Sequence, residues 1–104
     1  MRSQRQIGCP FNVPEALHLP RLAQSSPERP LELPGGSLSV LHLSRPQDGG
    51  LLACWYVCLE GTLILDLAYG DFLQLRVGES YRAAAGETRK LTPVRAATVL
   101  IVAC

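Results

Sequence analysis

The sequence predicts an all-β protein, a sandwich or barrel built from about seven short strands. Two observations carry this prediction. From Leu38 onward, short apolar runs rich in Leu, Val and Ile alternate with turn residues, which is typical of strands. Before that point the chain has no apolar periodicity of the helical kind, because prolines interrupt it repeatedly.

Residues 1–36 are expected to form an extended arm. Each proline removes a backbone N–H and disfavours a helical turn before it, so only extended chain or short strands are compatible with this spacing. Pro34-Gly35-Gly36 marks the turn into the second part, residues 37–104, which is expected to be the barrel domain. The arm holds six of the eight prolines, Pro10, Pro14, Pro20, Pro27, Pro30 and Pro34.

The expected strands follow one another with clear turn signals between them. Gly70-Asp71 suits a tight hairpin turn, and residues 45–50 and 60–61 are expected to be a loop and a turn. The only expected helical nucleus is Ala83–Ala85, which Gly86 stops. The strands are predicted over residues 38–44, 52–59, 62–68, 72–77, 81–84, 90–92 and 96–104.

Composition limits the classes of function. With 104 residues, 47% hydrophobic and 18% charged, the chain fits one folded domain. The net charge is +1 and no basic block occurs, so the sequence carries no electrostatic footprint for nucleic acid or an anionic membrane. No run of about 18 apolar residues exists, which excludes a helical membrane span. The N-terminus lacks the apolar core of a signal peptide, so a cytoplasmic protein is expected.

The four cysteines are expected to be free thiols, mostly buried. Cys9, Cys54, Cys58 and Cys104 show no CxxC spacing and no nearby histidine pair, so a zinc ribbon or finger is not indicated. Without a secretion signal, free thiols are favoured over the alternative of two disulfides.

Three segments resemble the signature segments of the small cupins. They are YVCLEGTL (residues 56–63), LRVGES (residues 75–80) and AAAGETR (residues 83–89). The resemblance covers about half of the chain and implies a cupin-type jelly-roll barrel preceded by the arm. It also implies a homodimer, because cupins often pair through sheet edges and swapped N-terminal strands. The apolar face with Trp55 could serve such pairing or pack on a second sheet.

The residues at the metal positions of this family are replaced. Cupins hold one divalent metal with two histidines and a carboxylate from the first motif and a histidine from the second. On this resemblance Asp48 and Gly50 fall near the first two positions, Cys54 at the carboxylate position and Arg89 at the second-motif histidine. A guanidinium offers a metal no lone pair and repels it. We therefore expect no metal and no other cofactor.

Candidate ligand-binding residues follow from the strand alternation and the resemblance together. Cys54, Tyr56 and Cys58 share one face of their strand, and the resemblance places that face inside the barrel with Arg89. A cation beside a phenol and a thiol would favour a small anionic or polar ligand and would make the thiol of Cys54 more nucleophilic. The full candidate set is Arg89, Tyr56, Cys54, Cys58, His42 and Tyr81.

Alternatives remain open for these residues and for the function. Arg89 could point outward or pair with Glu87 or Asp66, the thiols could be core filler, and His42 could be a hydrogen-bonded structural histidine. Three functions compete. The first is a metal-free barrel that binds a small molecule, and the second is a structural or interaction module with a filled barrel. The third, which ranks below both, is an enzyme that depends on a metal or on a thiol.

Overall fold

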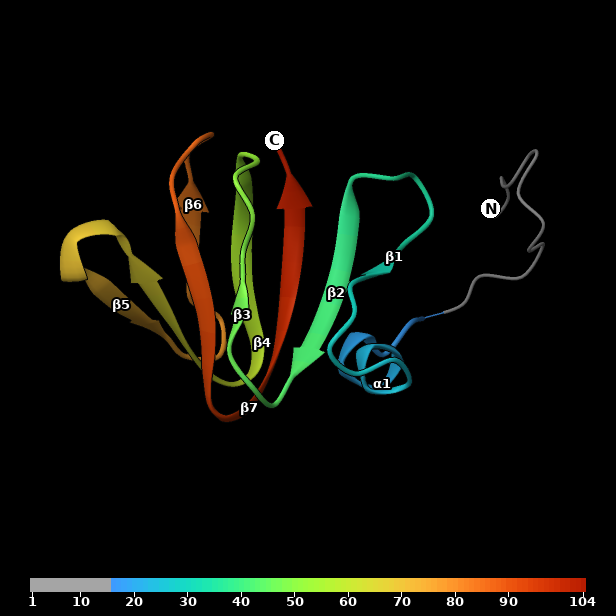
Figure 1. The fold of residues 1–104 in the computed structure, drawn as a ribbon. Helices are drawn as coiled ribbons and strands as arrows, with labels where there is room; N and C mark the ends of the chain where they lie inside the picture. The colour runs from blue at the N-terminus through green and yellow to red at the C-terminus, as the bar shows by residue number, and fades with distance from the viewer. Residues whose placement is uncertain (1–15) are drawn as a thin grey trace.

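The computed structural model describes residues 16–104, which form one seven-stranded sheet with little helix (Figure 1). The all-β prediction is confirmed. The strands run in the order β1-β2-β7-β4-β5, with β3 also beside β7 and β6 also beside β4. The elements are α1 (Leu19–Gln24), β1 (Leu31–Glu32), β2 (Leu38–Leu43), β3 (Gln47–Asp48), β4 (Cys54–Leu67), the 3-10 turn η1 (Ala68–Gly70), β5 (Phe72–Leu75), β6 (Ser80–Ala83) and β7 (Arg89–Ala103).

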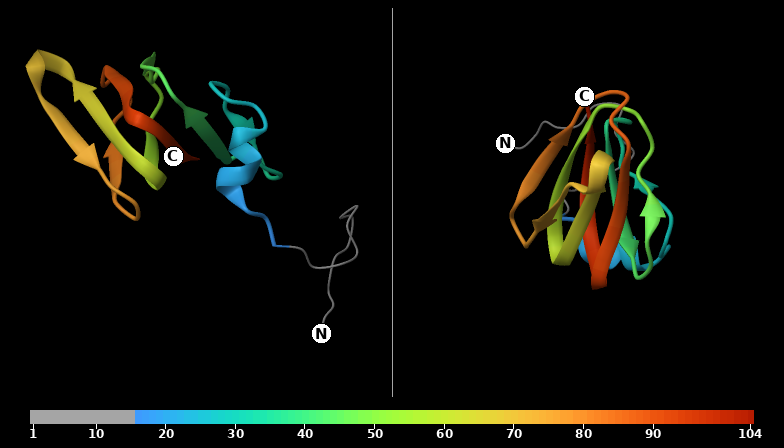
Figure 2. Two further views of the ribbon diagram at one scale, coloured as in Figure 1. Left: turned by 90° about the horizontal axis from the view of Figure 1, so that it is seen from below. Right: turned by 60° about the vertical axis from the view of Figure 1, so that its left-hand side comes forward.

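Two long antiparallel strands, β4 and β7, belong to both layers of the barrel. The first part of β4 pairs with β6 and its last part pairs with β5, as the predicted hairpin at Gly70-Asp71 requires. The C-terminal part of β7 pairs with β2, and its N-terminal part pairs with β3. The sheet therefore folds over on itself, and its two layers face each other (Figure 2).

The fold of the sheet depends on a bend at Gly61, where the sequence predicted a turn between two strands. Gly61 has a φ of 76°, and a Cβ at this position would collide with the backbone carbonyl of Ala96. The register between β4 and β7 shifts on both sides of this glycine. The chain thus bends within one long strand, because glycine alone accepts both this backbone angle and this close approach.

The expectation of an extended arm is wrong over residues 19–24, which form α1 and pack beside β2. Pro20 lies in the first turn of this helix, where its missing N–H leaves no bond unmade. His18 caps the helix, since its Nδ1 accepts a hydrogen bond from the backbone N–H of Arg21 at 3.2 Å. The expected helical nucleus at residues 83–85 instead ends β6 and enters a turn. Residues 1–15 of the predicted arm, with Cys9, lie outside the described residues.

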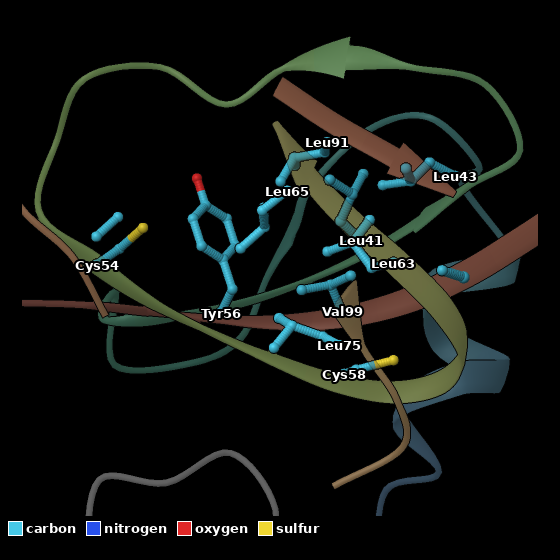
Figure 3. Packing of buried hydrophobic residues seen from close by; sticks show 12 residues of the cluster. Leu41, Leu43, Cys54, Tyr56, Cys58, Leu63, Leu65, Leu75, Leu91 and Val99 are labelled. Atoms are coloured by element: carbon cyan, nitrogen blue, oxygen red, sulfur yellow. The ribbon is translucent and has the colours of Figure 1, made fainter. Parts of the chain in front are cut away.

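The hydrophobic core fills the middle of the barrel (Figure 3). Burying one large apolar side chain contributes about 1.5–3 kcal/mol, so this cluster is the main source of stability. Its largest members come from both layers, and they are Leu41, Leu43, Tyr56, Leu63, Leu65, Leu91 and Val99. Cys54 and Cys58 lie at opposite ends of the cluster, and the hydroxyl of Tyr56 points away from the leucines (Figure 3). Within residues 16–104 no helix is long and apolar enough to cross a membrane.

Candidate functional site

A cavity of about 400 Å³ opens at the end of the barrel marked by Cys54 and Tyr56. Its volume falls within the range of about 300–1,000 Å³ that is typical of small-molecule sites. The segment between β3 and β4 forms part of its rim and carries Leu51 and Leu52, which are 55% and 83% exposed. The apolar wall is supplied by Leu38, Leu41, Leu91, Ile101, Cys54 and Tyr56.

Arg89, the first residue of β7, is a buried cation with only 6% of its surface exposed. Its guanidinium donates three hydrogen bonds to backbone carbonyls. Nε donates to Glu87 at 2.9 Å, Nη1 to Leu52 at 2.8 Å and Nη2 to Ala84 at 2.9 Å. One side chain thus ties the segment before β4 to the turn between β6 and β7.

Three of the predicted site residues meet at this guanidinium. Nη1 of Arg89 lies 3.3 Å from the hydroxyl of Tyr56 and 3.6 Å from Sγ of Cys54. The guanidinium carbon also lies 5.8 Å from the centroid of the Tyr56 ring, within reach of a cation–π interaction. The hydroxyl of Tyr56 donates to the carbonyl of Gly49 at 3.0 Å. Burial raises the pKa of Tyr56 to about 12, so this hydroxyl remains a donor at neutral pH.

The guanidinium of Arg89 nevertheless lies behind the cavity wall, where it contacts the lining residues Tyr56 and Cys54. Arg89 is absent from the residues that line the cavity, whereas Cys54, Tyr56 and Gly49 are present. Gly49 packs directly on Arg89, since a Cβ there would collide with the arginine side chain. The expected arrangement, a cation facing into the barrel as an anchor for an anion, is therefore not the one that this structure has.

Tyr81 and Cys58 lie outside the cavity wall. The hydroxyl of Tyr81 donates to Oε2 of Glu87 at 2.7 Å, and this bond lowers the pKa of Glu87 and raises the pKa of Tyr81. Tyr81 thus fastens the same turn that Arg89 holds. Sγ of Cys58 lies 3.6 Å and 3.4 Å from the carbonyls of Glu60 and Gly61, at the bend of β4. Burial raises the pKa of the Cys58 thiol, which makes it a poor nucleophile.

His42 lies on the other face of β2 and takes part in a hydrogen-bond network with α1. Its Nδ1 is 3.0 Å from Oγ1 of Thr98, which lies 3.4 Å from Oε1 of Glu60. Nε2 of Gln24, in α1, donates to the same Glu60 oxygen at 3.1 Å. This is the structural histidine that the sequence allows as an alternative, and its network fastens the helix to the sheet.

A metal does not fit these residues. In residues 16–104 no three His, Cys, Asp or Glu side chains lie close enough to hold an ion. The second-motif position, where the resemblance would place a histidine, carries the guanidinium of Arg89. Of the described cysteines, Cys54 and Cys58 are buried free thiols and Cys104 is an exposed one.

Sequence reasoning missed the rim of the cavity. The sequence predicts a loop at Gly49, between the positions Asp48 and Gly50 that the resemblance assigns to replaced metal ligands, and a strand at Leu52. It does not name Leu51 or Leu52 as candidate site residues. The available signal was the pattern of two glycines followed by two leucines, Gly49-Gly50-Leu51-Leu52, directly before a strand. Two adjacent leucines left exposed in a loop can belong to an apolar patch, and such patches mark binding grooves or contact surfaces.

No family model and no curated protein matches the chain, but solved structures do. The protein NMB1881 from Neisseria meningitidis superposes with a TM-score of 0.72 at 13% identity, over 85% of this chain and 97% of that one. A cupin-2 domain-containing protein from Shewanella frigidimarina gives a TM-score of 0.62 at 16% identity, over 74% and 80%. This chain has the cupin fold. The cupin domain of Drosophila melanogaster CENP-C also superposes, with a TM-score of 0.55 at 11% identity over 67% and 62%. Likeness at such identities establishes the fold of this chain and not its activity.

Proposed function

We propose that this cupin binds a small molecule in the cavity at the end of its barrel, without a metal. The observation that carries the proposal is the cavity itself, about 400 Å³ in volume and walled mainly by apolar side chains. Small-molecule sites are usually preformed concave spaces of this size with a few polar groups among apolar ones. Cys54 and Tyr56, two of the residues singled out from the sequence, form part of the wall.

In this proposal Arg89 is a positioning residue and not the anchor of the ligand. Its Nη1 holds the carbonyl of Leu52, and Tyr56 holds the carbonyl of Gly49. These two bonds fix both ends of the segment that forms the rim. A rim held in place needs little further ordering when a ligand enters, which favours affinity.

A fragment screen by two-dimensional ¹⁵N–¹H NMR, with a cavity-filling variant as control, tests the proposal. Ser39 lines the cavity and pairs with Ile101, so Ser39→Phe places a ring in the space. Ser80 pairs with Val57 at the edge strand β6 and lies outside the cavity, so Ser80→Phe adds the same ring elsewhere. We expect fragments that shift the NMR signals of residues around the cavity. Ser39→Phe should abolish their binding, and Ser80→Phe should leave it intact. Hits that survive Ser39→Phe, or an absence of hits, would overturn the proposal.

The exposed leucines of the rim favour a second candidate, a surface that contacts another protein. Leu51 and Leu52 are neighbours at the mouth of the cavity. One of the matching Drosophila structures is described as CENP-C bound to CAL1, so a cupin-fold domain of another protein has a protein partner. Replacing both leucines by serine should abolish such contact, whereas Ser39→Phe, which fills the cavity behind them, should leave it in place.

Pairing of two copies remains part of the proposal. Trp55, on the outer face of β4, is 41% exposed and pairs in register with Val102 of β7, so an apolar patch faces outward there. Sedimentation equilibrium of the wild type and of Trp55→Ser tests the homodimer directly. A wild type that stays monomeric at about 100 µM would contradict it, because the Kd of the dimer would then lie well above that concentration. The cytoplasmic location stays a prediction from the sequence.

A further inference from the structure

The charged residues that line the cavity have the opposite sign from the one expected. Among the described residues, Glu32 of β1 and Asp48 of β3 are the only charged ones in the lining, and both carry carboxylates. Arg89, the cation that was expected there, packs behind Gly49 and donates a hydrogen bond to the backbone carbonyl of Leu52. The charged side chains that a ligand in the cavity can touch are therefore carboxylates, while the guanidinium of Arg89 lies behind Tyr56 and Cys54.

Strand register shows which of the two carboxylates faces the ligand. Glu32 pairs with Ser39, and directly paired residues project from the same face of a sheet. Ser39 is two residues from Leu41, a core residue, so Ser39 and Glu32 both project toward the inside of the barrel. Asp48 pairs with Lys90, next to the buried Leu91, and so projects outward beside a lysine. Glu32 is thus the carboxylate on the inner face.

We propose that the ligand of this cavity is a small organic cation, an amine with an apolar body. This inference rests on the proposed function and specifies the class of ligand. The apolar body would lie against the wall formed by Leu41, Leu91 and Ile101. The ammonium group would lie at the mouth, where the Glu32 carboxylate and the Ser39 hydroxyl can accept its hydrogen bonds.

The exposure of Glu32 sets the size of the effect. This residue is exposed, so solvent screens its interaction with a bound ammonium group. Exposed ion pairs of this kind change affinity by up to about fivefold. A carboxylate ligand would instead bring a second negative charge to Glu32, which disfavours it.

A matched set of three probes tests the inference: 2-phenylethylamine, 2-phenylethanol and 3-phenylpropanoate, titrated by NMR at low salt. They share a body that fits the cavity and differ in the charge of the head group. We expect the amine to bind about two- to fivefold more tightly than the alcohol, and the carboxylate to bind most weakly. Glu32→Gln should remove the preference for the amine, and about 0.5 M NaCl should reduce it.

Asp71→Asn is the matched control, because Asp71 is an exposed carboxylate outside the lining. It should leave all three affinities unchanged. Tighter binding of the carboxylate, or a preference for the amine that survives Glu32→Gln, would overturn the inference while leaving the cavity as a binding site. If none of the probes binds in a way that Ser39→Phe abolishes, the proposed function fails and this inference fails with it.

Discussion

Replacement of Arg89 gives the sharpest test of how this barrel end is built. Arg89→Met keeps most of the apolar stem and removes the charge and all donors. Three hydrogen bonds to backbone carbonyls are lost, each worth about 1.5–3 kcal/mol because the donor is charged. Two effects reduce the sum: Leu52 and Ala84 are exposed residues, so water can replace the lost donors at their carbonyls, and the variant no longer buries a cation. We therefore expect the free energy of unfolding to fall by about 2–3 kcal/mol.

Arg89→Lys separates the shape of the guanidinium from its charge. A lysine keeps the charge but presents its donors from a single point, so it cannot reach carbonyls on two segments at once. We expect it to be at least as destabilising as Arg89→Met. Urea unfolding followed by the fluorescence of Trp55 gives both values, provided that the m-value does not change. A lysine variant within about 0.5 kcal/mol of wild type would refute the bracing role, since a point charge would then suffice.

Four further predictions concern single groups. The free energy of unfolding of the wild type should fall as pH rises from about 10 through 12, because Tyr56 loses its phenolic proton at lower pH in the unfolded chain than in the folded one. Tyr56→Phe should remove this loss. Gly61→Ala should cost about 3 kcal/mol or more in urea unfolding, since it adds backbone strain to a collision with the carbonyl of Ala96. Glu87→Gln should reduce the loss of stability at acid pH. The pKa of Glu87 is lowered in the folded state, so its carboxylate stabilises the fold above pH 4.5 and this stabilisation is lost as the pH falls through the folded pKa. Elemental analysis of tag-free protein incubated with iron, zinc, manganese and nickel should find metal well below one equivalent, because in residues 16–104 no three His, Cys, Asp or Glu side chains lie close enough to hold an ion.

Matched variants keep these predictions specific. Gly78 has a φ of 89° but open space where a Cβ would lie, so Gly78→Ala should cost only the backbone contribution of about 1 kcal/mol. An equal cost at Gly61 and Gly78 would contradict the packing argument.

Tyr81→Phe should reduce the loss of stability at acid pH as Glu87→Gln does, since the hydrogen bond from the Tyr81 hydroxyl is the largest cause of the lowered pKa of Glu87. An alkaline loss that persists in Tyr56→Phe would assign it to another group.

The strands and their facing could be predicted because they depend on local patterns. Alternation placed Cys54 and Tyr56 on one face of β4, and the pleat carries this information without any distant contact. The bend at Gly61 could not be predicted in the same way. From the sequence, a glycine after Glu60 is equally compatible with a turn between two strands. The bend within one strand depends on the close approach of the carbonyl of Ala96, which belongs to the distant strand β7. The helix α1 was missed because proline usually breaks helices, whereas Pro20 lies in the first turn, where it is tolerated.

The direction of the Arg89 charge depended on groups that no residue pattern reveals. The resemblance placed Arg89 with Cys54 and Tyr56, and the three do meet. Its partners, however, are main-chain carbonyls, which every residue carries, so the sequence does not distinguish a guanidinium that faces a cavity from one that binds a turn. Because those carbonyls hold the guanidinium, the charged side chains in the cavity lining are carboxylates. Glu32, on the short edge strand β1, is the one on the inner face. A position that would hold a metal ligand in the resembled family thus braces the barrel end, and the proposed preference for an amine depends on Glu32 at the edge of the sheet.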